Sequence, residues 1–354
     1  MLKLFHTSDI HIGARNKYLG DKLFDEQKKF LKRLYNNARD EDVKYIVIAG
    51  DVFDSNYVGS NLVEEFFEII GYYNDIYTVI IPGGGKSHRQ EVTGHDAYTM
   101  DSVYRRPDVR QYLNRENIIF LSPDSPSKVV DNIAFYGGFF EIPNVSRLNA
   151  AFHIGVVHGP FSDVPKHGEI SVDELESMFF DYICLGHYHS FKKFNKCAYS
   201  GSLVQYEFSK KRLSSSGYIC VTIGSELNID YRIFKDAPGF YKKEILDLED
   251  IKWIEDKINK GNFVEIIGYV KELKMQVENL LENPNIRLSD GVIEYERDGI
   301  YGIIEDTIDE ILSMDIGFAK DLIDDIKVFI LKNIRGNLTK PKIEEFLKNK
   351  YLSC

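Results

Sequence analysis

Aspartate and histidine recur at short, regular spacings in five segments of this chain. These are residues 7–11 (TSDIH), 50–54 (GDVFD), 82–96 (PGGGKSHRQEVTGHD), 157–159 (VHG) and 186–189 (GHYH). Carboxylates with imidazoles are ligands for manganese, iron or zinc, whereas calcium and magnesium prefer oxygen alone. Two such ions roughly 3.5–4 Å apart, bridged by a carboxylate and a hydroxide, hold a phosphodiester for in-line attack. The pattern therefore predicts a two-metal hydrolytic site.

The spacing within these segments would let two side chains of one segment reach the same metal site. Asp9 and His11 stand two residues apart, as do His187 and His189, and side chains at this spacing point to the same side of an extended chain. Each motif taken alone has an ordinary structural explanation, such as a turn or a core histidine. Their joint order, each after an apolar run, favours a metal site.

The elements expected around the motifs alternate between strands and helices. Apolar runs predict the strands LKLFHT, YIVIAG, YTVIIPGG, NIAFYGGF, FHIGVVHG, YICLGHYH and GYICVTI, and apolar residues at helical spacing predict helices at 24–39 and 60–73. In α/β sheets, ligands bind beyond the carboxyl ends of strands. We therefore expect the five segments to meet at one edge of the fold.

After residue 238 the pattern changes. Strand and helix signals, with helices near 250–260 and 271–282, predict a small β-α-β-α-β module. Residues 305–334 have apolar side chains at i, i+3 and i+4, which is typical of amphipathic helix. A chain of 354 residues with 44% apolar residues can form more than one globular domain.

The composition also indicates the cellular location of the protein and bears on whether it binds nucleic acid. The longest apolar runs are too short to span a membrane, and the first residues resemble a buried strand rather than a secretion signal. Four cysteines without CxxC spacing argue against a zinc finger or a disulfide framework, so we expect a reducing, cytoplasmic location. The net charge of −11 weakens a nucleic-acid hypothesis without excluding it, because local basic stripes decide such binding.

The order DIH, GDVFD, a glycine-rich HD loop, VHG and GHYH resembles the calcineurin-like metallophosphoesterase superfamily over roughly residues 1–205. More narrowly, FHTSDIHIG, LGHYHS and YSGSLVQYEF resemble the SbcD-type and double-strand-break-repair DNA nucleases. The resemblance implies an α/β fold, namely a four-layer-type β-sandwich flanked by helices, with a small α+β capping domain and C-terminal helices. The corresponding domains would be 1–237 (nuclease), 238–300 (cap) and 301–354 (a helical segment that docks a partner).

The same resemblance implies roles for individual residues. Asp9, His11 and His189 would hold one metal, Asp51 would bridge, and His158 and His187 would hold the second metal. Asp54 and Asp96 would orient these ligands. Manganese is the expected metal, with iron, zinc or magnesium as alternatives.

One family motif departs from its usual form. Where the superfamily has Gly-Asn-His-Asp, this chain has Thr93-Gly94-His95-Asp96, so the asparagine ligand is missing. Thr93, Ser87, a backbone carbonyl or water could replace it. We favour His95 as the catalytic histidine, with His88 as the alternative. Such an imidazolium can stabilise the phosphoryl oxygens and protonate the leaving alkoxide.

Basic residues follow the metal loops in the sequence. We expect a phosphate backbone to contact Arg15, Arg105, Arg106, Lys192, Lys193, Lys210 and Lys211. Interleaved aromatic residues would stack on unpaired bases, namely Phe191, Phe194, Tyr206 and Phe208. The alternative is that these are solvated cations and core aromatics.

These observations favour a DNA exo- or endonuclease of DNA repair that hydrolyses phosphodiesters by attack of a metal-bound hydroxide on phosphorus. The resemblance further implies an SMC-like coiled-coil ATPase partner of the SbcC type, and a homodimer. Two other classes stay open. One is a phosphodiesterase or phosphatase for a small molecule such as a cyclic nucleotide, and the other is a non-catalytic binding protein on the same fold.

Overall fold

The computed structural model describes residues 1–14, 22–86, 92–166, 169–208 and 216–295. The chain forms two compact units. The first comprises Met1–Lys242 and Asp256–Glu265, and the second comprises Lys243–Glu255 and the residues from Ile266 onward. All five motif segments belong to the first unit. Among the described helices, none is both long and apolar enough to cross a membrane.

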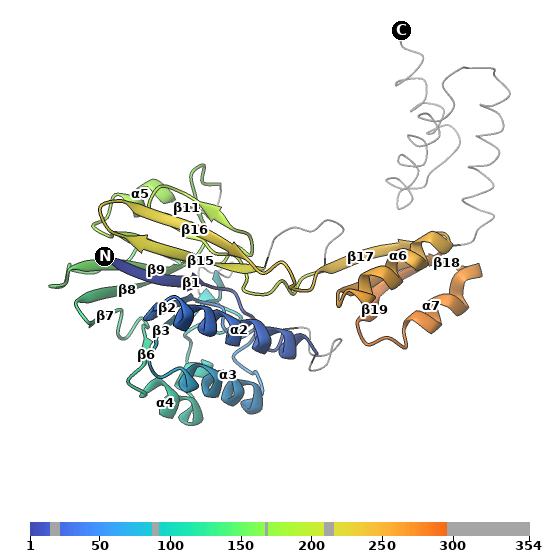
Figure 1. Ribbon diagram of the computed structural model, residues 1–354, viewed down its shortest axis with the longest axis horizontal. Helices are drawn as coiled ribbons and strands as arrows, with labels where there is room; N and C mark the ends of the chain where they lie inside the picture. The colour runs from blue at the N-terminus through green and yellow to red at the C-terminus, as the bar shows by residue number, and fades with distance from the viewer. Residues whose placement is uncertain (15–21, 87–91, 167–168, 209–215, 296–354) are drawn as a thin grey trace, which may run out of the picture. The chain divides into compact units, whose positions relative to one another are not determined.

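The first unit is built on two six-stranded sheets (Figure 1). The first sheet has the order β16 (Leu227–Ile233), β15 (Gly217–Ile223), β1 (Leu2–Thr7), β2 (Tyr45–Ala49), β3 (Tyr77–Ile81) and β6 (Ile118–Phe120). The second has the order β13 (Lys192–Lys193), β14 (Cys197–Tyr199), β12 (Tyr182–Gly186), β9 (Phe152–His158), β8 (Ile133–Phe139) and β7 (Ser127–Val130). Two short pairings lie in the loops, namely β4 (Gly85–Lys86) with β5 (Val92–Thr93) and β10 (Phe161–Ser162) with β11 (Ile170–Ser171).

The apolar strands of the first sheet are buried on both faces. In β1, Leu4 belongs to the core between the two sheets, whereas its neighbour Phe5 belongs to the core beneath the helices. Val47 and Ile48 of β2 divide in the same way. Successive side chains of a strand point to opposite faces, so a strand buried on both faces is apolar throughout. This is why these segments have continuous apolar runs.

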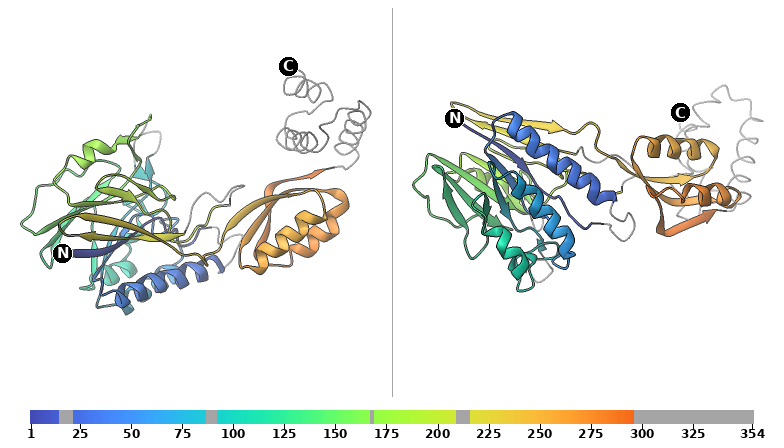
Figure 2. Two further views of the ribbon diagram at one scale, coloured as in Figure 1. Left: turned by 45° about the horizontal axis from the view of Figure 1, so that its top comes forward. Right: turned by 60° about the horizontal axis from the view of Figure 1, so that its bottom comes forward.

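Helices cover the outer face of the first sheet. The helices α2 (Lys22–Asp40), α3 (Ser60–Tyr72) and α4 (Pro107–Leu113) contribute buried residues to the same core as Phe5 and Ile48, and they lie together on that face (Figure 1 and Figure 2). On the second sheet, α5 (Val172–Glu176) packs its Val172 and Leu175 into a separate outer core. The predicted α/β sandwich flanked by helices is confirmed.

Strand direction explains why the motifs meet. The strands β1, β2 and β3 are parallel, and so are β9 and β12 of the other sheet, so that each group ends at one edge. At that edge the sheets approach each other closely. A Cβ added to Gly186 would lie only 1.8 Å from the carbonyl oxygen of Ala49. Only glycine allows this approach. The carboxyl ends of both sheets therefore form a single site.

After residue 238 the chain forms the predicted β-α-β-α-β succession. Its elements are β17 (Phe240–Ile245), α6 (Leu248–Asn259), β18 (Phe263–Val270), a 3₁₀ turn (Lys271–Leu273), α7 (Lys274–Leu280) and β19 (Ile286–Tyr295). The strands form one sheet in the order β17-β18-β19. The amphipathic segment predicted at 305–334 lies outside the described residues.

Candidate metal centre

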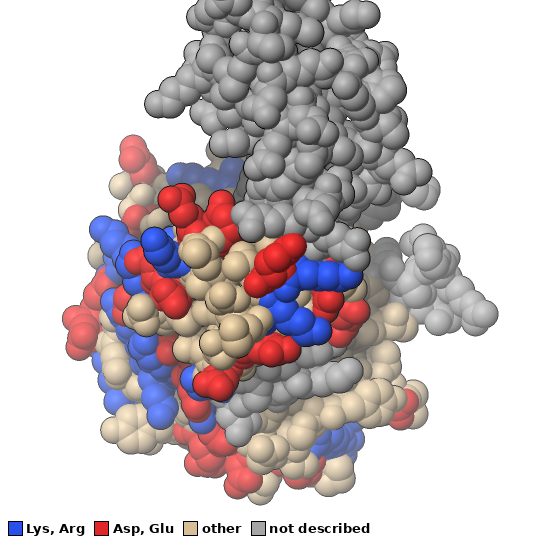
Figure 3. Space-filling view, turned by 90° about the vertical axis from the view of Figure 1, so that its right-hand side faces the viewer, with Lys and Arg blue, Asp and Glu red and all other residues tan. Residues whose placement is uncertain are grey.

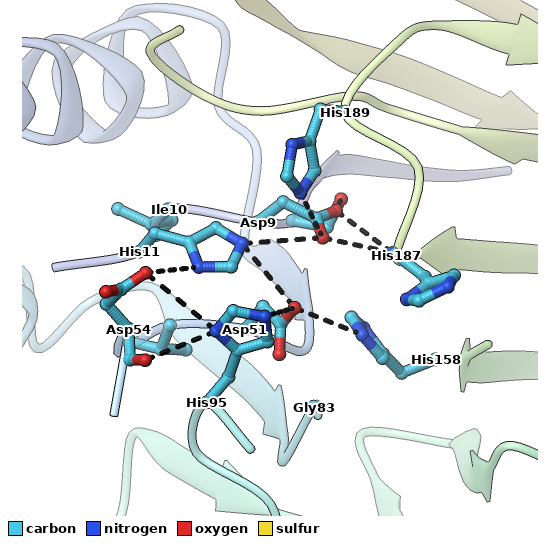
Figure 4. Close-up of polar contacts among 12 residues, drawn as sticks. Asp9, Ile10, His11, Asp51, Asp54, Gly83, His95, His158, His187 and His189 are labelled. Atoms are coloured by element: carbon cyan, nitrogen blue, oxygen red, sulfur yellow. Dashed lines mark hydrogen bonds and ion pairs between the residues drawn. The ribbon is translucent and has the colours of Figure 1, made fainter. Parts of the chain in front are cut away.

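Asp51 lies at the centre of the converging side chains, as Figure 4 shows. Its Oδ2 is 3.5 Å from Nε2 of His11, 3.4 Å from Nε2 of His158 and 4.0 Å from Nε2 of His95. Its Oδ1 accepts a hydrogen bond of 2.6 Å from the backbone N–H of Gly84. Only 2% of the residue is exposed. A buried carboxylate with imidazoles on several sides is suited to bridging cations.

Asp9 forms the second carboxylate of the site. Its Oδ1 is 4.0 Å from Nε2 of His11 and 3.8 Å from Nε2 of His189. Both of its oxygens lie 3.1 Å from the backbone N–H of His187, and the hydroxyl of Ser8 donates to Oδ2. These bonds fix the carboxylate in one orientation toward the histidines.

The side chains fit divalent cations. Nε2 of His11 and Nε2 of His158 are buried, and neither has a hydrogen-bond partner among the described residues. A buried polar atom without a partner is costly, and a metal ion would satisfy both nitrogens. Ligand atoms within 4.8 Å of one another occur in three groups, namely Asp9-His11-His189, Asp9-Asp51-His158 and His11-Asp54-His95. The mixture of imidazole and carboxylate suits manganese, iron or zinc.

The free nitrogens face the site because the other ring nitrogens are occupied. Nδ1 of His158 lies 2.8 Å from the carbonyl oxygen of Ala49, which can only accept. Nδ1 of His11 lies 3.2 Å from Oδ1 of Asp54. Each contact favours a proton on Nδ1, so Nε2 is the ring nitrogen that faces a cation. Asp54 thus holds the ring of His11 in one orientation.

His187 takes part differently from the other predicted ligands. Its backbone N–H binds Asp9, but its ring is not in the three convergent groups of described residues. The ring packs edge-on against His158, with centroids 5.4 Å apart, and against Phe140 at 5.3 Å. Burial and the neighbouring His158 lower the pKa of His187 to about 4. Its imidazole is thus neutral and available to a cation at neutral pH.

The backbone at this site is strained. Asp9, His11, Asp51, His95 and His187 all have positive φ, between 35° and 111°. Aspartate and histidine tolerate this region better than most residues, but each still carries a cost. Such outliers cluster where ligand geometry is constrained by the surrounding structure, which agrees with a functional centre here.

His95 reaches the site, as the favoured interpretation of the loop predicts. Its Nδ1 is 3.2 Å from the carbonyl oxygen of Asp54, and its ring lies edge-on to that of His11 with centroids 4.6 Å apart. The side chain is 41% exposed, unlike the buried ligands. It can therefore contact a substrate. The alternative His88, with Ser87, lies outside the described residues.

The next residue, Asp96, holds the loops together. Its carboxylate accepts from the backbone N–H groups of Gly83 (2.7 Å), Val52 (2.9 Å) and Phe53 (3.3 Å), and from the hydroxyl of Tyr104 (2.6 Å). It is fully buried. Asp96 thus joins the loops after β2 and β3.

Glycine stands where an asparagine ligand would be expected. Gly94 has φ +77° and open space around it. As a glycine it has no side chain that could bind a metal. Nearer Asp51, a Cβ on Gly83 would lie 2.0 Å from Oδ1 of that carboxylate, so no side chain fits there either. Thr93 is exposed. Among the described residues of these loops, Gly84 supplies a backbone N–H that binds Asp51.

Two positioning residues were missed by sequence reasoning. Gln27, on α2, is buried and donates from Nε2 to the carbonyl oxygens of Ile10 (2.6 Å) and His11 (3.2 Å). A polar residue within the apolar stripe of an amphipathic helix was the signal that could have found it. Tyr206 packs its ring 4.5 Å from that of His11, and its hydroxyl lies 3.2 Å from Nε2 of His189.

The aromatic residues expected to stack on unpaired bases do not form such a surface. Tyr206 and Phe208 are only 6% and 7% exposed, so the prediction was wrong for them. Phe191 is stacked on Tyr231 with ring centroids 4.3 Å apart. Phe194 is partly buried against the core of the second sheet. The alternative interpretation, core aromatics, describes them.

Two arginines predicted to contact DNA are engaged within the protein. Arg105 forms an ion pair of 3.0 Å with Asp124, and its guanidinium lies 4.1 Å above the ring of Tyr98. Arg106, the residue just before α4, forms an ion pair of 2.6 Å with Asp108 and donates to the carbonyl oxygen of Val58. Both arginines therefore hold loops of the fold in place.

The other predicted cations are less tied to the fold. Lys192 forms an exposed ion pair of 2.7 Å with Asp163, and Lys193 is exposed. The remaining three, Arg15, Lys210 and Lys211, lie outside the described residues. On the face shown in Figure 3, lysine and arginine are interspersed with aspartate and glutamate over the described surface.

The protonation of His158 predicts a pH dependence of metal binding. Burial lowers its pKa, but the carboxylates of Asp51 and Asp9 raise it, and the balance is about 9. Below that pH the ring of His158 in the metal-free protein is an imidazolium, and a cation must displace one of its two ring protons. We therefore expect manganese affinity to rise with pH, by up to about tenfold per pH unit near neutrality.

Calorimetric titration with manganese at two pH values would measure this. Repeating it in buffers of different ionisation enthalpy would count the protons released. An affinity that stays constant with pH, with no proton released, would show that His158 is already neutral.

The match to a protein-family model agrees with this geometry. The family model described as calcineurin-like phosphoesterase matches residues 2–191. The SbcD subunit of the nuclease SbcCD from Staphylococcus epidermidis is 26% identical over 323 residues, covering 80% of this chain and 84% of that protein. Among solved structures, TT1561 of Thermus thermophilus matches 65% of this chain and 98% of its own, with a TM-score of 0.43 and 12% identity. The family match covers more than half of the chain and all the metal-site residues, so this protein is a member of the calcineurin-like phosphoesterase family and a metal-dependent phosphoesterase.

Proposed function

We propose that the protein is a two-metal phosphodiesterase that cleaves DNA, acting as an exo- or endonuclease in DNA repair. The observation that carries the proposal is the buried pair of unpartnered nitrogens, on His11 and His158, on either side of Asp51. One cation at each nitrogen, with Asp51 between them, gives the arrangement that stabilises both oxygens of an in-line displacement.

In this proposal Asp9, His11 and His189 hold one ion, Asp51 bridges, and His158 and His187 hold the other. Manganese is the proposed metal, because imidazole and carboxylate are mixed. When bound, the ions would supply Lewis-acid stabilisation of the charge that develops on the phosphoryl group. The chain itself orients the ligands through Asp54, Gln27 and Asp96.

His95 acts on the substrate rather than on the metals. Its partial exposure and its position beside Asp51 would let a protonated imidazole contact a phosphoryl oxygen or the leaving alkoxide. Proton donation by a positioned side chain contributes typically 10²–10⁴-fold to a rate.

DNA is proposed as the substrate from similarity to a protein named as a nuclease subunit, most of whose length this chain covers. From the resemblance of the motifs we further propose that an SMC-like ATPase docks on residues 301–354, that residues 238–300 cap the nuclease domain of 1–237, and that the protein is a homodimer. The cysteine pattern suggests that it works in the cytoplasm. A second candidate, a phosphodiesterase for small nucleotides, is favoured by the internal pairing of Arg105, Arg106 and Lys192.

The test is hydrolysis of end-labelled single- and double-stranded DNA with added manganese. We expect metal-dependent degradation that chelation abolishes. If DNA stays intact while bis-p-nitrophenyl phosphate is hydrolysed in a metal-dependent way, the small-nucleotide candidate replaces the nuclease. If neither substrate is cleaved by the metal-loaded protein, alone or with an SMC-like ATPase added, the proposed activity is wrong.

A further inference from the structure

A cleft of about 420 Å³ opens beside the metal centre. It shares a wall with that centre, because Gly83 lines the cleft and a Cβ at Gly83 would lie 2.0 Å from Oδ1 of Asp51. The end of β8 also lines the cleft, and there Phe139 pairs in register with His158. A group bound in the cleft would therefore lie close to a phosphate bound at Asp51, so both could belong to one ligand.

The walls of the cleft suit a flat aromatic group. Tyr98 and Phe139 contribute rings, while Gly83, Gly137 and Gly138 contribute bare peptide groups. A Cβ at Gly138 would lie 2.8 Å from Pro143, and one at Gly137 would lie 2.9 Å from the ring of Phe139, so these walls stay free of side chains. A lining of aromatic rings and bare peptide groups favours a stacked planar ligand.

Tyr98 is held rigidly in this wall. Its hydroxyl donates to Asp124 at 2.9 Å, and the guanidinium of Arg105 lies 4.1 Å above its ring. The ion pair between Arg105 and Asp124 closes this small network. A preorganised ring loses little entropy when a ligand stacks on it.

The charged side chains among the described lining residues disfavour binding of a phosphate in the cleft. Among the described residues that line it there is no lysine, arginine or histidine, and the one charged side chain is Glu141, which is exposed. Asn144 adds an exposed amide. A carboxylate repels phosphate oxygens, but it accepts hydrogen bonds from amino or imino groups, and an amide can both donate and accept.

We propose that this cleft binds the nucleobase of the nucleotide whose phosphate lies at the metal centre. The proposal rests on the proposed phosphodiesterase function and adds a base-binding subsite to it. Tyr98 and Phe139 stack on the base, and Glu141 and Asn144 contact its polar edge. A cleft of this volume accommodates a base with its sugar. The base can come from the end of a DNA strand or from a small nucleotide.

The kinetic test compares two esters in the manganese-loaded protein. One is thymidine 5′-(p-nitrophenyl phosphate), and the other is the same ester of 1,2-dideoxyribose, which lacks the base. Both release p-nitrophenolate, so the chemical step is the same. We expect kcat/KM to be about tenfold or more higher for the thymidine ester, since stacking of one base is worth this much.

Cleft variants localise the effect. Asn144→Trp would fill the cleft from its rim, and Tyr98→Ala would remove a stacking ring. Both are expected to bring the ratio of the two kcat/KM values toward one. Met100→Ala, at a residue that is 85% exposed and outside the cleft, serves as the control and keeps the ratio of the unmodified protein.

Binding provides a readout without turnover. Calorimetry with thymidine 5′-monophosphate and with 1,2-dideoxyribose 5-phosphate, in the presence of manganese, should show the same preference and the same loss in Asn144→Trp. If neither ester is hydrolysed, the proposed function fails, while the calorimetric comparison still decides the base subsite.

An oligonucleotide with an abasic residue at the cleaved position separates the two sources of the base. Slower cleavage than of the intact strand assigns the subsite to DNA, whereas a preference seen with free nucleotides alone assigns it to small nucleotides. Equal rates and equal affinities with and without the base would overturn the proposal. So would a base preference that both cleft variants leave unchanged.

Discussion

Replacing Asp51 with asparagine is expected to reduce phosphodiester hydrolysis by at least about a thousandfold, because Lewis-acid stabilisation worth several kcal/mol would be lost. Oδ2 of Asp51 lies within 3.5 Å of the unpartnered nitrogens of both His11 and His158. An amide is neutral and presents one oxygen, so it bridges cations poorly. Steady-state kinetics with bis-p-nitrophenyl phosphate would measure the loss of activity, and direct metal analysis would measure the loss of bound metal.

A matched control is available in the same chain. Asp42 also has a positive φ, 52° against 50° for Asp51, but its side chain is 88% exposed in the turn before β2. Asparagine tolerates this conformation, so Asp42→Asn makes the same chemical change without touching the centre. It should retain full activity. Near-normal turnover by folded Asp51→Asn, checked by thermal unfolding, would refute the bridging role.

Replacing His95 with asparagine is expected to slow cleavage of a substrate with an alkoxide leaving group by about 10²–10⁴-fold while metal content stays unchanged. The imidazole stands beside Asp51 but is 41% exposed, so it faces substrate. An alkoxide needs a proton as it leaves, whereas p-nitrophenolate does not. The defect should therefore be much smaller with a p-nitrophenyl ester than with DNA.

The pair of substrates separates the roles that His95 could have. An equal loss on both would assign the imidazole to the phosphoryl oxygens rather than to the leaving group. Loss of a bound ion in His95→Asn would instead make it a ligand, in the group that it forms with His11 and Asp54. His88→Asn tests the alternative histidine, and the favoured assignment is wrong if that variant carries the catalytic defect.

The sequence by itself determined the fold class and most of the residues that converge. Asp9, Asp51 and His158 each stand at or just after the end of an apolar strand. Parallel strands end at one edge of a sheet, so order along the chain translates directly into proximity in space. His95 was favoured on a different ground, because the residues after His95-Asp96 resemble the family's continuation, whereas His88 stands nearer the end of the strand YTVIIPG.

Only the tertiary structure decided which of the other residues serve that centre. Arg105 follows the metal loop in sequence, but Asp124 reaches it through the fold and pairs with it. Tyr206 was expected to stack on a base, yet it is buried against His11. Such outcomes depend on contacts between residues far apart in the chain, whereas periodicity and spacing carry only local information. The cleft beside Gly83 arises in the same way, where loops from both sheets meet.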